Sequence, residues 1–424
     1  MFVVFCEPRH IGVVTALRAL GVRRFATMTD GMAESIRAAT PEAHLIRLES
    51  LLDDDENAAI DARAAERVFR VRSYARSHPI AVDERVLPLS PFDVDRVLAA
   101  RLENDLSETE KVLSAFDRLN ASVEIRGFVC SADFTRLTAA ACQWMRSKVI
   151  PSFHVLHGIG LGPLFHSDRR VRADYVLAPG RAGALQYLDL GVSPDRVAIT
   201  GSPSLDPYAT LVRTQPQVRS NLRTMCGFPE EARVVVFATT CPNSSIALSE
   251  FQRGVQTLEA FGAAAAYLQD RGVDCRFIVK DRVQSGQSGR ELVDRVMRAA
   301  GVKALYAAGR PEILACGADV VVASDSGISV EAMACGVPTV NVWSPATWLL
   351  GPYFASYHAV PHFRCDEPHQ LGAEIGRLLS DADYREERIA AQREAFTDIA
   401  LAADGNAGRR CAEFIVAHSA PAGP

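Results

Sequence analysis

Small polar residues and one carboxylate gather in the stretch 323–340, which reads ASDSGISVEAMACGVPTV. The apolar run before it, 318–323, predicts a buried parallel strand. The segment 328–335 predicts a helix, which Gly336 and Pro338 would end. A strand, a turn and a helix in this order place backbone N–H groups at the carboxyl edge of a sheet, where a phosphate binds well.

The side chains of this stretch suit contact with an activated nucleotide. Gly327 would let an anion approach the backbone closely. Glu331 would lie one turn into the helix, where its carboxylate could accept hydrogen bonds from a ribose diol. An ordinary βαβ turn with an exposed glutamate fits the same pattern. The nucleotide-binding candidates are Ser324, Asp325, Ser326, Gly327, Ser329 and Glu331.

This arrangement resembles the donor-nucleotide site of GT-B glycosyltransferases and of the related nucleotide-sugar 2-epimerases. The resemblance implies an α/β chain with two Rossmann-like domains facing across a cleft, the nucleotide lying on the second. It covers roughly residues 122–418, and the first 120 residues match only in a general way. The matching residues are Ser326, Gly327, Glu331, Ala332, Gly336 and Pro338.

A second chemically useful group follows a predicted strand at 149–156, which runs into His157 and Gly158. The pair resembles the acceptor-side loop of teichoic acid glycerophosphotransferases and of capsule transferases. By that resemblance His157 is the general base, and a near-neutral imidazole can take a proton from an attacking hydroxyl. Asp133, at the end of the predicted strand 122–130, is a further catalytic candidate. A structural histidine beneath the cleft is the alternative for His157.

Other candidates for the acceptor or the cleft also follow predicted strands. Arg9 and His10 come after the first strand, and a solvated loop fits them as well. Gly201 and Ser202 follow the strand 196–200. Strand ends of an open α/β sheet line its ligand crevice, which makes these four residues candidate contacts. The exit from the first domain also resembles the same families at Thr200, Gly201, Pro203 and Asp206.

Two groups in the second half could contact the diphosphate. Thr239, Thr240 and Asn243 follow an apolar strand and can donate hydrogen bonds, although turn preference alone would also explain them. Lys280 and Arg282 follow the next strand and could neutralise the leaving diphosphate. Lys280 is therefore both a donor-site and a catalytic candidate. Many relatives have a histidine near this point, and this chain has none.

Two sets of residues have spacing like that of metal ligands. His154 and His157 would point to opposite faces of a strand, which argues against a shared ion. His362, Cys365 and His369 fall in a segment that we predict to be a loop without a fourth ligand. We therefore expect no metal site and no cofactor other than the nucleotide-activated sugar as substrate.

The length of 424 residues predicts about two domains. We place an N-terminal acceptor domain at 1–205, a linker at 206–230 and a nucleotide-donor domain at 231–403. Residues 404–424 would form a C-terminal helix and tail. We predict one helix within the linker and a helical or partly irregular excursion at 51–75.

Charge and composition restrict the partners. The net charge of −5 argues against nucleic acid as a partner. The sequence has no apolar run of 18 residues, so we predict no transmembrane helix. The N-terminus has no signal-peptide pattern, and the ten cysteines include no CxxC, which suits reduced thiols in the cytoplasm. Contact with the inner membrane face would be at most peripheral, and a homodimer is left open. A basic strip fits a solvated face first, and contact with an anionic lipid or polymer is the alternative; its residues are Arg67, Arg70, Arg72 and Arg76.

The sequence thus favours transfer of a sugar, or a related group, from a nucleotide-activated donor to a hydroxyl acceptor such as a glycan. A nucleotide-sugar 2-epimerase is the first alternative. Its carboxylates would be Asp133 and Asp168, but the epimerase pair of glutamates is replaced by Val330 and Glu331. A non-catalytic nucleotide-binding homologue is the second alternative. Walker A, GxGxxG and GxSxG motifs are missing, so an ATPase, an NAD enzyme or a serine hydrolase has no support.

Overall fold

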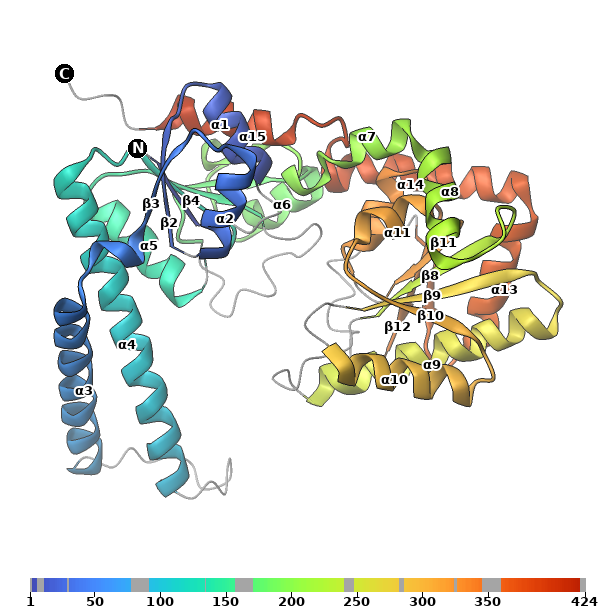
Figure 1. Cartoon of the computed structure of the whole chain (residues 1–424), viewed down its shortest axis with the longest axis horizontal. Helices are drawn as coiled ribbons and strands as arrows, with labels where there is room; N and C mark the ends of the chain where they lie inside the picture. The colour runs from blue at the N-terminus through green and yellow to red at the C-terminus, as the bar shows by residue number, and fades with distance from the viewer. Residues whose placement is uncertain are drawn as a thin grey trace.

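The structure is a computed structural model. It describes residues 2–5, 11–28, 30–77, 91–133, 135–156, 171–239, 248–281, 286–323, 326–344 and 360–419. Within these ranges the chain forms a seven-stranded and a six-stranded sheet, each covered by helices on both faces (Figure 1). All the strand pairs are parallel, which confirms the predicted α/β class with two Rossmann-like sheets.

The first sheet has the order β3-β2-β1-β4-β5-β6-β7. Strands β2 and β3 lie on one side of β1, and the strands from β4 onward lie on its other side, so the strand order reverses at β1. Helices α1 (Ile11–Ala19), α2 (Asp30–Ala39) and α15 (Ala407–His418) cover one face. Helices α4 (Pro91–Ser122), α5 (Arg136–Ser147) and α6 (Arg181–Asp189) cover the other. The strands are β1 Phe2–Phe5, β2 Arg24–Thr27, β3 His44–Arg47, β4 Gly127–Cys130, β5 Ser152–Val155, β6 Tyr175–Ala178 and β7 Val197–Ile199.

The second sheet has the order β10-β9-β8-β11-β12-β13. One face carries α9 (Leu248–Asp270), α10 (Gly286–Ala299) and α13 (Pro368–Ser380). The other carries α8 (Gln215–Cys226), α11 (Pro311–Gly317), α12 (Ile328–Ala334) and α14 (Ala382–Ala400). The strands are β8 Arg233–Ala238, β9 Cys275–Asp281, β10 Ala304–Ala308, β11 Val320–Ala323, β12 Thr339–Trp343 and β13 His362–Arg364.

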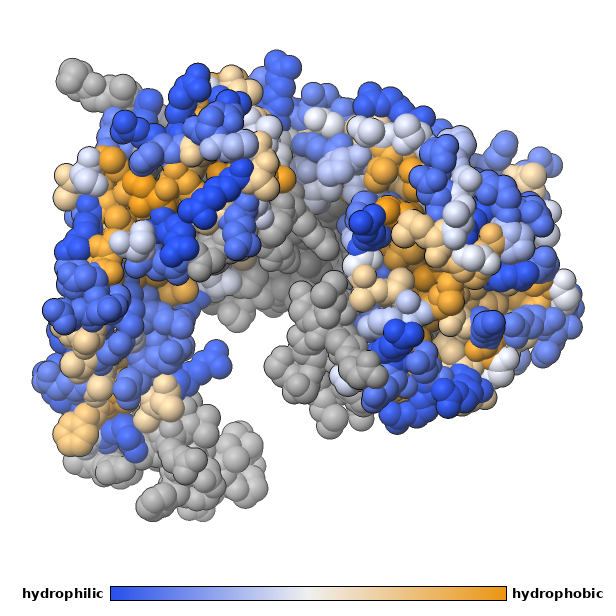
Figure 2. Space-filling view, viewed as in Figure 1, coloured by the Kyte–Doolittle hydropathy of each residue, from blue (hydrophilic) through white to orange (hydrophobic). Residues whose placement is uncertain are grey.

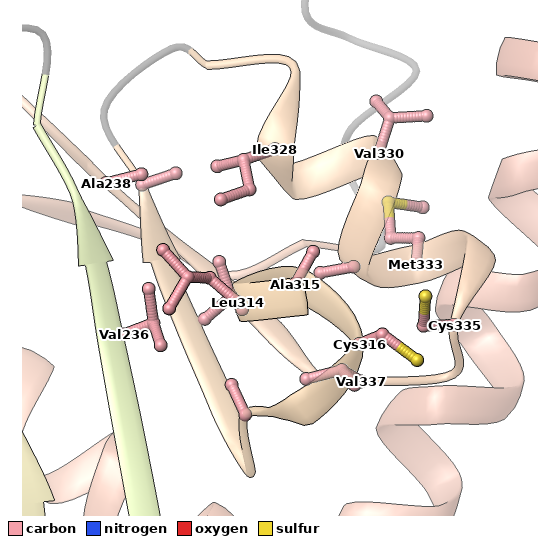
Figure 3. Close-up of a cluster of buried hydrophobic side chains, with 14 of the residues drawn as sticks. Val236, Ala238, Leu314, Ala315, Cys316, Ile328, Val330, Met333, Cys335 and Val337 are labelled. Atoms are coloured by element: carbon pink, nitrogen blue, oxygen red, sulfur yellow. The ribbon is translucent and has the colours of Figure 1, made fainter. Parts of the chain in front are cut away.

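The central strands of this second sheet are apolar because both of their faces are buried. Val236 and Ala238 of β8 pack toward Leu314 of α11 and Ile328 of α12 (Figure 3). The alternate residues of β8, such as Phe237, pack against α9 on the opposite face. A continuous apolar run is the expected sequence of such a strand.

Helix α3 (Asp54–Ser77) forms a long antiparallel pair with α4 that extends from the first sheet (Figure 1). A capping box begins α3, since Asp53 Oδ1 accepts from the Glu56 N–H at 2.8 Å and Glu56 Oε2 from the Asp53 N–H at 3.0 Å. Arg67 of the predicted basic strip is paired with Glu110 on α4. The excursion predicted at 51–75 is therefore mainly helical, and one cation of the strip is engaged within the pair.

Two predictions about local structure were wrong. The connection after β7 holds two helices, α7 (Tyr208–Arg213) and α8, rather than one. Helix α8 packs on the second sheet, where Arg223 pairs with buried Asp319 at 2.7 Å. The segment expected to be a loop around His362 instead forms β13, a three-residue edge strand beside β12. The domain limits at 205, 230 and 403 stay predictions.

The last helix, α15, packs on α1 of the first sheet although the chain reaches it after the second (Figure 1). Asp206, just after β7, accepts hydrogen bonds from the N–H groups of Ala407 at 2.9 Å and Gly408 at 2.8 Å. A Cβ on Gly408 would lie 2.7 Å from the carbonyl carbon of Gly12, so only glycine allows this close approach. Asp206 therefore fixes the start of α15.

Two further properties concern the cysteines and the helices of the described residues. Every cysteine among them is a free thiol, in agreement with the expectation of reduced cysteines. Across the ranges given above, no helix is long and apolar enough to cross a membrane.

Replacing Asp206 by alanine should lower the free energy of unfolding by about 1–2 kcal/mol, because two N–H groups of α15 would lose their acceptor. Asp206→Asn keeps one acceptor oxygen and should cost less. Urea unfolding would measure both variants against Asp189→Ala, which removes an exposed carboxylate from α6. Equal stability of Asp206→Ala and the Asp189 control would contradict this role.

The free energy of unfolding should also depend on pH through Asp404, which lies just before α15. A hydrogen bond from Arg410, at 2.8 Å, lowers the pKa of Asp404 to about 2 from the usual 3.8. A lowered pKa stabilises the fold above about pH 4, and this contribution disappears as the pH falls toward about 2. Because Asp404 is 41% exposed, we expect less than about 1 kcal/mol. The difference in unfolding free energy between wild type and Asp404→Asn should therefore shrink from pH 6 to pH 2, and a constant difference would contradict it.

Candidate functional site

The polar candidates of the second half that the structure describes lie where the strand order of the second sheet reverses. From β8 the chain proceeds through α9 to β9 on one side, while β11 lies on the other side of β8 and leads into α12. Helices α9 and α12 cover opposite faces, so the segments after β8 and β11 diverge. Such a divergence opens a ligand crevice at the carboxyl ends of the strands.

The strand register brings Thr239 and Lys280 to this edge. Ala238 of β8 pairs with Lys280 on β9 and with Ala323 on β11. The Thr239 N–H donates to the Lys280 carbonyl at 2.9 Å. Thr239 is buried and Lys280 is half-buried. The structure thus places Thr239 next to β11, the strand that precedes the predicted nucleotide-binding turn, and Lys280 one strand further away.

The turn itself is closed by backbone hydrogen bonds. The N–H of Ser329 donates to the Ser326 carbonyl at 3.0 Å, and the N–H of Glu331 donates to the Gly327 carbonyl at 3.1 Å. Gly327 has a right-handed φ of −55°, so its backbone does not require glycine. Apart from its chain neighbours, no described atom lies within 4 Å of a Cβ built on Gly327. Among the described residues, this side of the backbone is therefore open.

Glu331 is only 6% exposed, which excludes the alternative of an exposed glutamate on an ordinary turn. It lies in the first turn of α12, as predicted. Helix α7, which begins at Tyr208, packs near α12. Burial first, and then the charge of Glu331, raises the pKa of the Tyr208 phenol.

Asn341 and His362 lie beside this turn and were not among the predicted site residues. Ser329 Oγ donates to Asn341 Oδ1 at 3.0 Å, and Asn341 Nδ2 lies 3.3 Å from His362 Nε2. An amide nitrogen only donates, so this network assigns the proton of a neutral His362 to Nδ1. An asparagine inside the apolar strand TVNVW is the sequence signal that could have found the chain of contacts. The position of His362 could not be inferred, because β13 was not predicted.

Asp133 lies at the corresponding switch point of the first sheet, just after β4, and is fully buried. Its Oδ2 accepts from the N–H groups of Arg172 at 2.7 Å and Ala173 at 3.1 Å. Its Oδ1 lies 3.5 Å from Nδ1 of buried His154. Burial, with the charge of Asp133 second, raises the pKa of neighbouring Tyr187. The described contacts of Asp133 hold the backbone that leads into β6, and its catalytic role stays a prediction.

Gly201 and Ser202, predicted to line the cleft, lie beside α15. Gly201 has a φ of +85°, and a Cβ on it would lie 3.0 Å from Cβ of Ala407. The Ser202 hydroxyl is 2.8 Å from that of Ser204. Gly201 thus contacts the C-terminal helix, and among the described residues neither Gly201 nor Ser202 has a contact with Asp133. A side chain at Gly201 would be strained.

Several predicted site residues lie outside the described residues, and their placement stays a prediction. Within the described ranges, no group of three or more potential ligands could hold a metal ion. The residues outside are Arg9, His10, His157, Gly158, Asp168, Thr240, Asn243, Arg282, Ser324 and Asp325.

A cavity of about 580 Å³ lies between α9 and α10. It is lined by Tyr267 and Asp270 near the end of α9, by Arg295 of α10 and by His369 of α13. This part of α9 is remote from the carboxyl edge of the sheet, where the helix begins. None of the predicted site residues lines this cavity, so we do not include it in the candidate site.

Comparison with known proteins identifies the fold. No protein-family model and no curated protein matches the sequence. Solved structures do match over nearly the whole chain. A UDP-GlcNAc 2-epimerase from Neisseria meningitidis, bound to UDP-GlcNAc, has a TM-score of 0.60 at 12% identity and covers 98% of this chain and 99% of its own.

Two transferases match over a similar length. A glycosyltransferase from Rickettsia africae has a TM-score of 0.56 at 9% identity and covers 99% of both chains. The wall teichoic acid polymerase TagF has a TM-score of 0.53 at 12% identity, with coverage of 98% of this chain and 88% of its own. The chain therefore has the two-domain GT-B fold that these glycosyltransferases and 2-epimerases share.

Proposed function

We propose that this protein is a glycosyltransferase that moves a sugar, or a related group, from a nucleotide-activated donor to a hydroxyl acceptor. The observation that carries the proposal is the convergence of Thr239, Lys280, the Ser326–Gly327 turn and Glu331 at the switch point of the second sheet. Ligands of open α/β sheets bind at such points.

In this proposal each donor-site residue has a distinct task. The open backbone at Gly327 and the hydroxyl of Thr239 would hydrogen-bond the diphosphate. Lys280 would offset the charge that develops on the leaving diphosphate, a form of electrostatic stabilisation that requires donors fixed in advance. Glu331 would accept hydrogen bonds from the ribose. With these groups and Arg282, the reaction needs no cofactor besides its donor.

The acceptor would be activated from the first domain. His157, which follows β5, would take the proton of the acceptor hydroxyl as its oxygen attacks the transferred carbon. The bond from that carbon to the diphosphate oxygen breaks, and the nucleoside diphosphate leaves. Asp133 fixes the backbone at the start of β6, beyond the segment that holds His157. We therefore assign Asp133 a positioning task in this scheme.

The solved neighbours support a nucleotide-linked donor. The Neisseria epimerase was solved with UDP-GlcNAc, and TagF was soaked with a ligand abbreviated CDPG. Both concern activated sugars or related groups, which fits a role in glycan or polysaccharide biosynthesis. We place the reaction in the cytoplasm, with at most peripheral contact at the inner membrane face.

A 2-epimerase is the second candidate, because the Neisseria epimerase aligns with nearly the entire chain at a TM-score of 0.60. An epimerase needs carboxylates around the sugar, and Asp133 is the described carboxylate at the switch point of the first sheet. Epimerisation would change the sugar of the donor without any acceptor present.

Nucleotide binding should stabilise the wild type against heat. A nucleotide at about 100 times its Kd adds about 2.7 kcal/mol to the free energy of unfolding. Thermal unfolding with UDP, CDP, GDP, dTDP and CMP should identify one preferred nucleotide. Glu331→Gln should lose most of this stabilisation, whereas Glu387→Gln, on the exposed side of α14, should retain it. No stabilisation of the wild type by any of the five would refute the donor site.

His157→Ala should separate binding from chemistry. A general base contributes about 10²- to 10⁴-fold to the rate, so transfer to an acceptor should fall by that factor while nucleotide affinity stays unchanged. NMR of the sugar product, with and without acceptor, would measure this. Full transfer activity in the variant would refute the assignment of the base, and an epimerised donor without acceptor would favour the second candidate.

A further inference from the structure

Four arginines lie around one aspartate at the amino edge of the second sheet, the edge opposite the candidate donor site. Arg233 is the first residue of β8, and Asp319 comes just before β11, the neighbouring strand. Arg219 and Arg223 belong to α8, and Arg385 lies in the first turn of α14. Both helices cover the same face of the sheet (Figure 1). We call these four arginines the arginine cluster.

The aspartate offsets the charge of one arginine. Arg223 Nη2 donates to Asp319 Oδ2 at 2.7 Å, and the Val234 N–H donates to the same oxygen at 2.8 Å. Arg385 Nη1 donates instead to the backbone carbonyl of Asp319, also at 2.8 Å. That carbonyl holds the Arg385 guanidinium in the cluster, but it carries no formal charge. Arg223 Nη1 also donates to the Arg219 carbonyl at 3.0 Å, one turn earlier on α8.

The other three arginines have no carboxylate close by. In the part of the chain that the structure describes, none of Arg219, Arg233 and Arg385 lies within 4.0 Å of a carboxylate oxygen. The buried Nε of Arg219 has no hydrogen-bond partner there. Asp381, one turn before Arg385, lies 3.6 Å from Arg377 and caps the start of α14. The three guanidinium groups thus retain donors for a further partner.

The cluster has an excess of positive charge. Burial first lowers the pKa of the Arg385 guanidinium, Asp319 opposes this, and the like charges of Arg219 and Arg233 lower the pKa further. Arginine nevertheless stays charged at neutral pH. The four arginines and the one aspartate carry a formal charge of +3 (4 − 1 = 3). An anion bound among them would relieve the repulsion between like charges.

A phosphate group fits this arrangement better than a carboxylate does. A guanidinium presents a planar fork of N–H donors that matches the oxygens of a phosphate, and such hydrogen bonds are stronger than those between neutral groups. A carboxylate has two oxygens to share among three forks, whereas a phosphate group has at least three. A phosphate monoester also carries a charge of about −1.5 to −2 at pH 7, which offsets most of the excess.

We infer that Arg219, Arg233 and Arg385 form a binding site for a phosphate or diphosphate group at the amino edge of the second sheet. The inference goes beyond the proposed function, because the donor nucleotide would bind at the opposite edge of the same sheet. The same chemistry is offered by a free phosphate and by the phosphate of a lipid headgroup, and the experiment below distinguishes these two sources.

Isothermal titration calorimetry with inorganic phosphate and with diphosphate, at constant ionic strength in chloride, tests the site. We expect Arg219→Gln to weaken binding roughly tenfold, as the loss of one charge-assisted contact would. Arg233→Gln should do the same. Lys280→Gln, in the candidate donor site, and Arg298→Gln, on the exposed side of α10, should bind as the wild type does.

Thermal unfolding without phosphate shows whether a variant is folded. Arg219→Gln should unfold at a midpoint equal to or above that of the wild type, because the change removes repulsion and no described hydrogen bond of that side chain. Phosphate should raise the midpoint of the wild type more than that of the variant. If Arg219→Gln is less stable without phosphate, Arg233→Gln decides the test, since Arg233 is exposed at the start of β8.

Cosedimentation with phosphatidylglycerol vesicles, against phosphatidylcholine vesicles, tests the lipid source. Binding of free phosphate that Arg219→Gln and Arg233→Gln weaken supports a site for a soluble ligand. Binding to phosphatidylglycerol alone, lost in the same variants, supports a site for a lipid headgroup. Equal binding by the wild type and both variants, loss of binding in Lys280→Gln instead, or no binding to any of these probes would overturn the inference and leave the donor-site proposal untouched.

Discussion

The hydrogen bonds of Asp206 join two distant parts of the chain that the rest of the structure needs in place. Asp206 lies where the chain leaves the first sheet, and it accepts from the first N–H groups of α15, 201 and 202 residues later. Helix α15 completes the core over α1, so this core is closed only when the end of the chain returns to it. Burial raises the pKa of Asp206, and the two N–H groups oppose that rise.

Buried carboxylates that accept hydrogen bonds from backbone N–H groups also occur at other junctions between segments of the chain. Asp133 accepts from Arg172 and Ala173 before β6. Asp319 accepts from Val234 at 2.8 Å and pairs with Arg223, which attaches α8 to the second sheet. A buried carboxylate without such donors would be strongly destabilising, so each one specifies a single arrangement of the segments that it joins.

The candidate site depends on these junctions. The parallel strands are apolar on both faces, which leaves their carboxyl ends as the place where polar side chains can gather. Thr239, Lys280 and the turn at Gly327 meet there because neighbouring strands end in register. Glu331 is buried at the same edge, on the helix α12 that packs near α7, and α7 begins two residues after Asp206. The proposed recognition of the nucleotide is thus linked to the connection between the sheets.

The sequence by itself determined the strand and the helix on either side of the predicted nucleotide-binding turn, because apolar periodicity and turn residues act over a few positions. The strand predicted at 318–323 and the helix predicted at 328–335 correspond to β11 (Val320–Ala323) and α12 (Ile328–Ala334). Only the tertiary structure decided that α15 returns to the first sheet, that β13 lies beside β12, and that α7 packs near α12. These features depend on contacts between residues far apart in the chain, whose burial and partners no local pattern specifies.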